Sequence, residues 1–201
     1  MKKSLMIASF ASLALMGAAH AAGDPEAGKA KSAMCMACHG ADGNSPAPNF
    51  PKLAGQHADY IAKQLKQFKS GERVDATMNG MVAALSEQDM LDLAAFYATQ
   101  QGTVGTAAES DVELGQMIYR AGNPTSGVAA CAACHGPQGM GNPMAKFPGL
   151  SGQHADYTVL QLKNFRSSTR NNDAGSMMRM VAKKMSDDEI NAVAQYVQGL
   201  Q

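Results

Sequence analysis

The feature that most constrains the fold of this chain is an internal repeat that spans most of its length. The segment Cys-Met-Ala-Cys-His-Gly at 35–40 recurs as Cys-Ala-Ala-Cys-His-Gly at 131–136, and Gly-Gln-His-Ala-Asp-Tyr at 55–60 recurs unchanged at 152–157. Two copies are fewer than the three or more that a stacked solenoid requires. Each copy must therefore form a small domain of its own, and a domain of about 90 residues buries little apolar surface.

The repeat divides the 201 residues into a domain at 22–102, a linker rich in Gly, Thr and Ala at 103–110, and a second domain at 111–201. Within each domain, apolar residues recur at helical spacing, and no run shows the sustained alternation of a strand. Ser86 and Ser186 each begin a capping box, with a hydroxyl followed three residues later by a carboxylate. The sequence therefore predicts an all-α fold of two tandem domains.

The first 21 residues have the three parts of a secretory signal peptide. They begin with Lys2 and Lys3, continue through an uncharged apolar run, and end in Ala19-His20-Ala21, which is a small-x-small cleavage site. The apolar run is shorter than the roughly 20 residues that span a bilayer. We expect cleavage after Ala21 and a mature protein in the periplasm, soluble or loosely associated with the membrane.

Composition excludes several classes of protein. The 17 basic and 17 acidic residues give a formal net charge of zero, and 45% of the residues are hydrophobic. An electrostatic case for binding nucleic acid is therefore missing, and a disordered chain is excluded. Aromatic residues make up only 5% and Trp is absent, so we expect another large apolar body to complete the two cores.

Cys-x-x-Cys-His is the attachment motif of c-type haem, and it occurs twice in this chain. Two thiols add across the two vinyl groups of the porphyrin, and the adjacent imidazole binds the iron. A zinc knuckle, a thioredoxin-like redox pair and plain disulfides are the alternatives, but none explains a His directly after both pairs. We therefore expect two covalently attached haem c groups. The attaching residues are Cys35, Cys38, Cys131 and Cys134, and the iron ligands are His39 and His135.

The second axial ligand of a c-type haem is commonly Met or His. Met78 and Met178 each stand eight residues before the Ser of the capping box, in a segment read as a loop, and only this pair is Met in both copies. We therefore predict Met78 and Met178 as the ligands, with Met177 and Met180 as alternatives in the second copy. The matched His57 and His154 make a bis-His site conceivable, although a surface or capping role is the simpler interpretation.

Other matched residues suit positions around the haem ligands. A ligating imidazole normally donates its other N–H to a carbonyl, and Pro51 and Pro148 stand at matched positions for this role, with Pro48 an alternative in the first copy. The matched Arg73 and Arg170 suit the carboxylates of haem propionates. A solvated surface position is an equally good interpretation of both arginines.

The two units together resemble the cytochrome c4 family of dihaem periplasmic electron carriers. The resemblance rests on the repeated Cys-x-x-Cys-His, Phe-Pro-x-Leu-x-Gly-Gln and Tyr-x-x-x-Gln-Leu motifs and on the matched Met, and it covers 22–201. It implies two class I cytochrome c domains around a pseudo-twofold axis, with the haem edges facing each other. It also implies Cys35, Cys38, His39 and Met78 at the first haem, and Cys131, Cys134, His135 and Met178 at the second.

The resemblance further implies an electron carrier between a quinol-oxidising bc-type complex and a terminal oxidase, expected to act as a monomer. Iron ligated on both faces has no open position for a substrate, so the same residues favour electron transfer over catalysis. The electron-transfer subunit of an exported dehydrogenase is an alternative function. A dihaem peroxidase is a third, but its chemistry needs a haem whose distal face opens, and the repeated Met argues against that.

Overall fold

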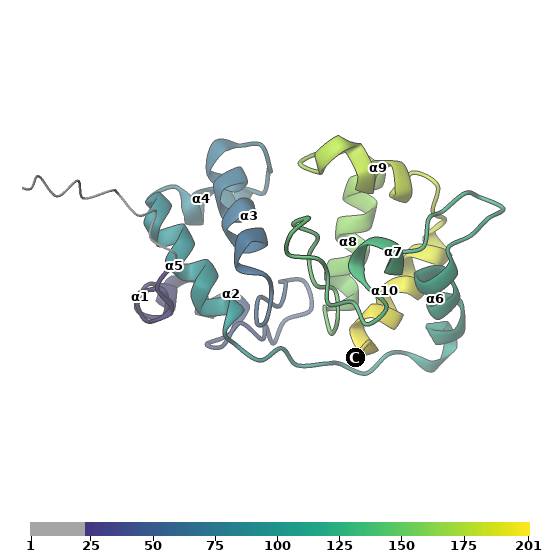
Figure 1. Ribbon diagram of the computed structural model, residues 1–201, viewed down its shortest axis with the longest axis horizontal. Coiled ribbons are helices and arrows are strands. Elements are labelled where there is room, and N and C mark those ends of the chain that lie inside the picture. Colours follow the sequence, from purple (N-terminus) through teal and green to yellow (C-terminus); the bar gives the residue numbers. More distant parts are fainter. Residues whose placement is uncertain (1–22) are drawn as a thin grey trace, which may run out of the picture.

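The computed structural model describes residues 23–201, except for the side chains of 109–111. The predicted signal peptide at 1–21 lies outside the described residues. Figure 1 shows two lobes of helices, placed side by side and joined by a connector that runs along one edge of the molecule. Within the described residues there is no strand, only two isolated bridges. The prediction of an all-α fold with two tandem domains is confirmed.

The two lobes carry the same series of helices. The N-terminal lobe contains α1 (Pro25–Lys31), a 3-10 turn η1 (Ser32–Met34), α2 (Met36–His39), α3 (Ala58–Ser70), α4 (Ala76–Val82) and α5 (Glu87–Ala98). The C-terminal lobe contains α6 (Glu109–Ala121), α7 (Ala132–His135), α8 (Ala155–Arg166), a 3-10 turn η2 (Ala174–Ser176), α9 (Met177–Ala182) and α10 (Asp187–Gly199). No helix among the described residues is long and apolar enough to cross a membrane.

Both predicted capping boxes are present and fix where the last helix of each lobe begins. Ser86 Oγ accepts from Asp89 N at 3.1 Å, and the Asp89 carboxylate accepts from Ser86 N at 2.8 Å. Ser186 and Glu189 repeat both bonds at the start of α10. These bonds satisfy N–H groups that have no partner inside the helix.

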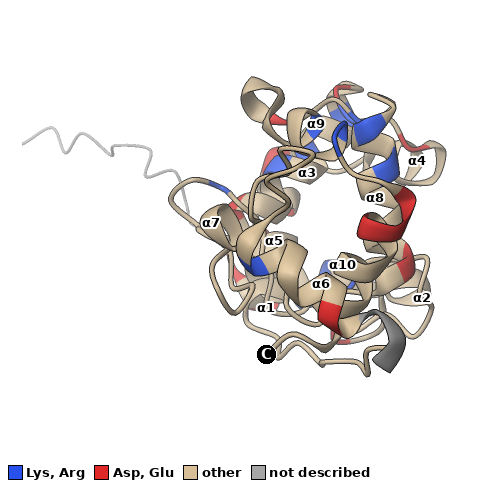
Figure 2. Ribbon diagram, turned by 90° about the vertical axis from the view of Figure 1, so that its right-hand side faces the viewer, with Lys and Arg blue, Asp and Glu red and all other residues tan. Residues whose placement is uncertain are grey.

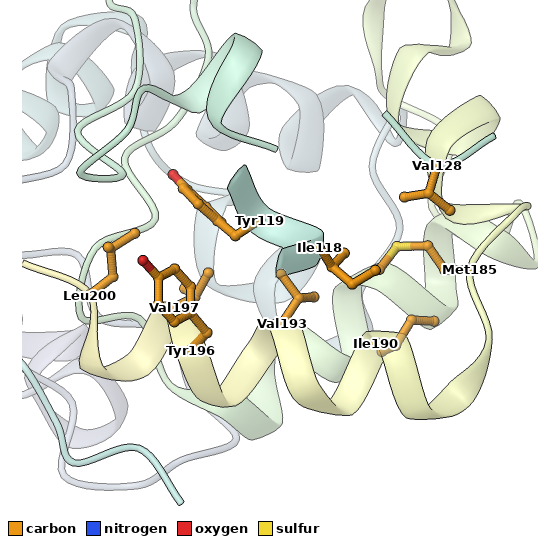
Figure 3. Close-up of a cluster of buried hydrophobic side chains, with 9 residues drawn as sticks. All are labelled: Ile118, Tyr119, Val128, Met185, Ile190, Val193, Tyr196, Val197 and Leu200. Carbon is orange, nitrogen blue, oxygen red and sulfur yellow. The ribbon is translucent and has the colours of Figure 1, made fainter. Parts of the chain in front are cut away.

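The first and last long helices of each lobe cross at a glycine. A Cβ added to Gly115 in α6 would lie 2.2 Å from Ala192 O in α10, and one added to Gly28 in α1 would lie 2.0 Å from Asp92 O in α5. Around the crossing in the C-terminal lobe lies a core of nine buried residues, which includes Ile118, Tyr119 and Tyr196 (Figure 3). The small residue thus lets the two backbones approach, and the core closes around that contact.

Two arginines are among the residues that join the lobes, and each lies over an aromatic ring of its own lobe and reaches the other lobe. Arg73 stacks 4.5 Å from the centroid of Phe68, and its Nη2 donates to Tyr157 OH and to Gln161 Oε1, both at 3.0 Å. Arg73 is only 9% exposed. The interpretation of Arg73 as a solvated surface side chain is therefore wrong.

Arg170 repeats this arrangement from the opposite side. It lies 4.5 Å from the centroid of the Phe165 ring, and its Nη2 donates to Tyr60 OH at 3.1 Å and to Gln64 Oε1 at 3.2 Å. Because it is held by partners in both lobes, Arg170 is also not a freely solvated residue. Elsewhere, charges of both signs are scattered among mostly uncharged ribbon (Figure 2).

The glycine crossing generates a stability prediction. We expect Gly115→Ala to lower the free energy of unfolding by about 1–3 kcal/mol, because the methyl group overlaps the α10 backbone and forces the helices apart. Chemical denaturation of the haem-loaded protein measures this change.

Gly80→Ala is the matched control. A Cβ at Gly80 in α4 meets nothing within 4 Å, and the corresponding position of the second repeat carries Met180. This variant should lose no stability, because Ala is the better helix former. Equal destabilisation by the two variants would contradict the role given to the crossing.

Candidate functional site

In each lobe, the Cys-x-x-Cys-His motif forms a single helical turn. In the N-terminal lobe, Cys35 is the N-cap residue of α2 and its carbonyl accepts from His39 N at 3.0 Å. In the C-terminal lobe, the carbonyl of Cys131 accepts from His135 N at 2.9 Å. The turn brings both thiols and the imidazole of one motif together. Gly40 and Gly136 then leave each turn with φ of +80° and +79°, a conformation that favours glycine.

No disulfide joins any of the four cysteines. Burial raises the pKa of Cys35, and it raises the pKa of Cys131 to about 11. Among the described residues, no three His, Cys, Asp or Glu side chains converge on a metal position. Because no disulfide, no such cluster and no strand of a βαβ unit occurs among the described residues, the disulfide, zinc and thioredoxin-like alternatives find no support.

Each motif histidine is oriented by a prolyl carbonyl. His39 Nδ1 donates to Pro51 O at 2.9 Å, and His135 Nδ1 donates to Pro148 O at 2.9 Å. The prediction of these two prolines is confirmed, and Pro48 is not the acceptor. Because a carbonyl can only accept, Nδ1 must carry the proton and Nε2 is left with a lone pair.

Burial also lowers the pKa of both histidines, although the bond to the prolyl carbonyl opposes this. The rings are thus held as neutral imidazoles in a fixed tautomer. Their planes are further restrained by neighbouring rings, since His39 lies 6.3 Å from Phe50 and His135 lies 6.2 Å from Phe147 between centroids. A neutral, oriented imidazole with a free Nε2 is the form that binds a metal.

Met78 lies in the first turn of α4, so the interpretation of this segment as a loop is wrong. The turn forms because Asp75 is its N-cap residue and accepts from Met78 N at 2.9 Å. α4 packs on α3, and Met78 is therefore on a separate element from the Cys-x-x-Cys-His turn. Its side chain is half-buried.

The C-terminal lobe has three methionines in α9, and they differ in exposure. Met177 is 39% exposed and Met180 is 57% exposed, whereas Met178 is half-buried. α9 packs on α8, as α4 packs on α3. Met178 is therefore the thioether of the three that most resembles Met78 in its surroundings.

An aspartate organises each methionine segment, which the sequence analysis missed. Asp75 acts at α4, and Asp173 accepts from Arg179 N at 3.0 Å and from Arg179 Nε at 2.7 Å beside α9. Burial would raise the pKa of Asp173, but the hydrogen bonds from Arg179 outweigh it and lower that pKa. The available signal was that an Asp precedes the Met in both repeats, three residues before Met78 and five residues before Met178.

His57 and His154 are the N-cap residues of α3 and α8, but neither side chain makes a capping hydrogen bond. His154 Nε2 donates to Ser45 O of the other lobe at 2.8 Å. His57 Nε2 is buried with no hydrogen-bond partner among the described residues. The expected capping by these side chains is therefore wrong, and both side chains are half-buried.

The residues of each lobe fit a covalently bound haem. Two cysteine side chains lie on one turn with an imidazole whose Nε2 is available, and a half-buried thioether is carried by a helix of the same lobe. A thioether and a neutral imidazole are the axial donors found in c-type cytochromes.

The chain is similar to known cytochromes along most of its length. The model of the cytochrome c family matches residues 25–101 and 112–201. Cytochrome c4 of Pseudomonas aeruginosa is 48% identical over 197 residues, which is 98% of each chain. A thiosulfate dehydrogenase electron acceptor of Stutzerimonas stutzeri is 41% identical over 81% of this chain and 76% of its own length.

A solved structure agrees with the sequence comparison. The crystal structure of reduced recombinant cytochrome c4 from Pseudomonas stutzeri superposes with a TM-score of 0.87 at 48% identity, covering 90% of this chain and all of that one. The chain therefore belongs to the cytochrome c4 family, and it is a dihaem electron-transfer protein with two covalently bound haem c groups, not an enzyme.

Proposed function

We propose that each lobe holds one haem through its own residues. Cys35 and Cys38 attach the first haem, with His39 and Met78 as axial ligands. Cys131 and Cys134 attach the second, with His135 and Met178 as axial ligands. The observation that carries this proposal is the matched pair of turns in which Nδ1 of the histidine is bonded to a prolyl carbonyl and Nε2 is free.

The residues of the chain then serve electron transfer by holding geometry. When bound, each haem would supply a one-electron Fe(III)/Fe(II) couple. The helical turn holds the imidazole, and Asp75 and Asp173 hold the backbone of the helices that carry the thioethers. With both faces ligated, the residues leave no open position for a substrate, and rigid ligands keep the geometry similar in both oxidation states.

The physiological role follows from these properties and from the family. We expect cleavage after Ala21, export to the periplasm, and electron transfer from a quinol-oxidising bc-type complex to a terminal oxidase. The electron acceptor of an exported dehydrogenase is a second candidate, and the similarity to a thiosulfate dehydrogenase electron acceptor favours it specifically.

The ligand assignment in the C-terminal lobe is tested by three matched variants. Met178→Leu should remove about half of the Met–iron charge-transfer absorption of the oxidised protein, since one of two haems loses its sulfur ligand. Met177→Leu and Met180→Leu should leave the band intact. Visible spectroscopy of the purified proteins measures the band. If Met177→Leu or Met180→Leu loses the band and Met178→Leu keeps it, the ligand is the methionine whose replacement removes the band.

The role of Asp75 is tested by its removal. Asp75→Ala deletes the acceptor of Met78 N, and the loss of such a cap costs about 1 kcal/mol. We expect the Met–iron band of the N-terminal haem to disappear at a lower temperature than in the wild type. Asp75→Asn keeps an acceptor oxygen and should retain most of the thermal stability of the band; an equal loss in both variants would contradict the capping role.

The physiological partners are distinguished by kinetics. Membranes that contain a bc-type complex should reduce the protein with quinol, oxidase-containing membranes should then oxidise it, and an inhibitor of the bc-type complex should block the first step. Stopped-flow measurement of haem reduction follows both reactions. If a thiosulfate dehydrogenase reduces the protein with a higher second-order rate constant than the bc-type complex does, the dehydrogenase-acceptor role replaces the carrier role.

A further inference from the structure

Gln56 and Gln153 each reach across the boundary between the lobes and bind both backbone polar groups of one residue. Gln153 Oε1 accepts from Lys52 N at 2.9 Å, and Gln153 Nε2 donates to Lys52 O at 3.0 Å. Gln56 Oε1 accepts from Gly149 N at 2.9 Å, and Gln56 Nε2 donates to Gly149 O at 2.9 Å. Each side-chain amide is therefore fixed in orientation, because its oxygen must accept and its nitrogen must donate.

Each glutamine is also held from its own lobe. Gln56 Oε1 accepts a second bond from His57 N at 3.0 Å, and Gln153 Oε1 accepts one from His154 N at 3.1 Å. Both side chains are half-buried. The two amides are thus pre-positioned to meet the opposite lobe.

The glutamines bind Lys52 and Gly149. These two residues come immediately after the prolines that orient the histidines. Lys52 N and Pro51 O belong to the same peptide group, as do Gly149 N and Pro148 O. In the N-terminal lobe this peptide accepts from His39 Nδ1 at its oxygen and donates to Gln153 at its nitrogen. One peptide group therefore links the imidazole of one lobe to a side-chain amide of the other.

The C-terminal lobe contains the matching relay, with the roles of the two lobes exchanged. The peptide between Pro148 and Gly149 accepts from His135 Nδ1 at 2.9 Å and donates to Gln56 Oε1 at 2.9 Å. Each relay begins at a histidine of one lobe and ends at a glutamine of the other, so the two relays connect the lobes in a crossed pattern.

Hydrogen bonds in such a chain polarise one another. A peptide whose N–H donates to an amide oxygen gathers more negative charge on its carbonyl oxygen, which becomes a better acceptor. A better acceptor draws the Nδ1 proton and makes the imidazole a more basic ligand. More electron density at the iron favours Fe(III), and the reduction potential falls.

We infer that Gln153 lowers the reduction potential of the haem in the N-terminal lobe, and that Gln56 lowers the potential of the haem in the C-terminal lobe. This inference rests on the proposed ligation of iron by His39 and His135. Both glutamines are positioning residues that act through a peptide group, and each lobe thereby tunes the haem of the other. By reciprocity, oxidation of a haem strengthens the hydrogen bonds that hold the lobes together.

The test exchanges each glutamine for methionine, which has similar length but makes neither hydrogen bond. In Gln153→Met, the ratio of reduced to oxidised N-terminal haem at fixed solution potential should rise about twofold, which is about 18 mV for a one-electron couple. The C-terminal haem should shift much less. Gln56→Met should give the mirror result, and NMR-monitored redox titration follows the two haems separately.

A second measurement reports on the relay itself. In the reduced protein, the His39 Nδ1 proton resonance should move upfield in Gln153→Met, and the His135 Nδ1 proton resonance should not. Gln153→Asn is too short to reach Lys52 and should give the same shifts, which keeps the test available if Gln153→Met folds poorly. Gln153→Glu keeps an acceptor for Lys52 N. The reduction potential of its N-terminal haem should therefore not exceed that of the wild type.

Tyr157→Phe is the matched control, because it removes the bond from Arg73 across the same boundary without touching either prolyl peptide. It should not reproduce the crossed pattern. Equal shifts of both haems in each glutamine variant, a larger shift in the lobe that carries the substitution, or no shift would overturn the inference. The inference is judged only on proteins that hold two haems with Met–iron bands. If the wild type does not show these bands, the proposed ligation is wrong, and the inference about the glutamines is not what has failed.

Discussion

The hydrogen bond between each motif histidine and a prolyl carbonyl is the constraint on which the rest of the structure depends. It fixes the tautomer and the plane of the ring, and so it leaves Nε2 as the nitrogen with an available lone pair. The helical turn that precedes it supplies the thiols, and the loop that follows supplies the carbonyl. The remaining helices of each lobe hold these two short segments in register.

Much of this arrangement was predictable from the sequence because it is local. The Cys-x-x-Cys-His turn, the capping boxes at Ser86 and Ser186, and the choice of Pro51 and Pro148 all follow from residues close together in the chain or matched between the repeats. The helix at Met78 was missed because one aspartate, Asp75, supplies the cap, and Gly and Asn in the same segment favour a loop when propensity alone is considered.

The contacts between the lobes could not be predicted in this way. Arginine is usually found at the surface of a protein. Only the packing of the two domains places Arg73 over Phe68 and within reach of Tyr157. Gln56 and Gln153 are likewise unremarkable by propensity. The one available signal was that the Gly-Gln-His-Ala-Asp-Tyr segment recurs unchanged, which is more identity than the start of a helix requires.

The two lobes share a fold but do not give their sites identical surroundings. His154 Nε2 donates to Ser45 O, and Ser45 Oγ donates to Cys38 O at 2.7 Å, so the C-terminal lobe also holds the attachment turn of the N-terminal lobe. The matched His57 makes no equivalent bond through Nε2 among the described residues. One attachment turn is thus braced from outside its lobe by an imidazole and the other is not. The two attachment turns of this duplicated protein therefore lie in unequal surroundings, although the helices that carry them are the same.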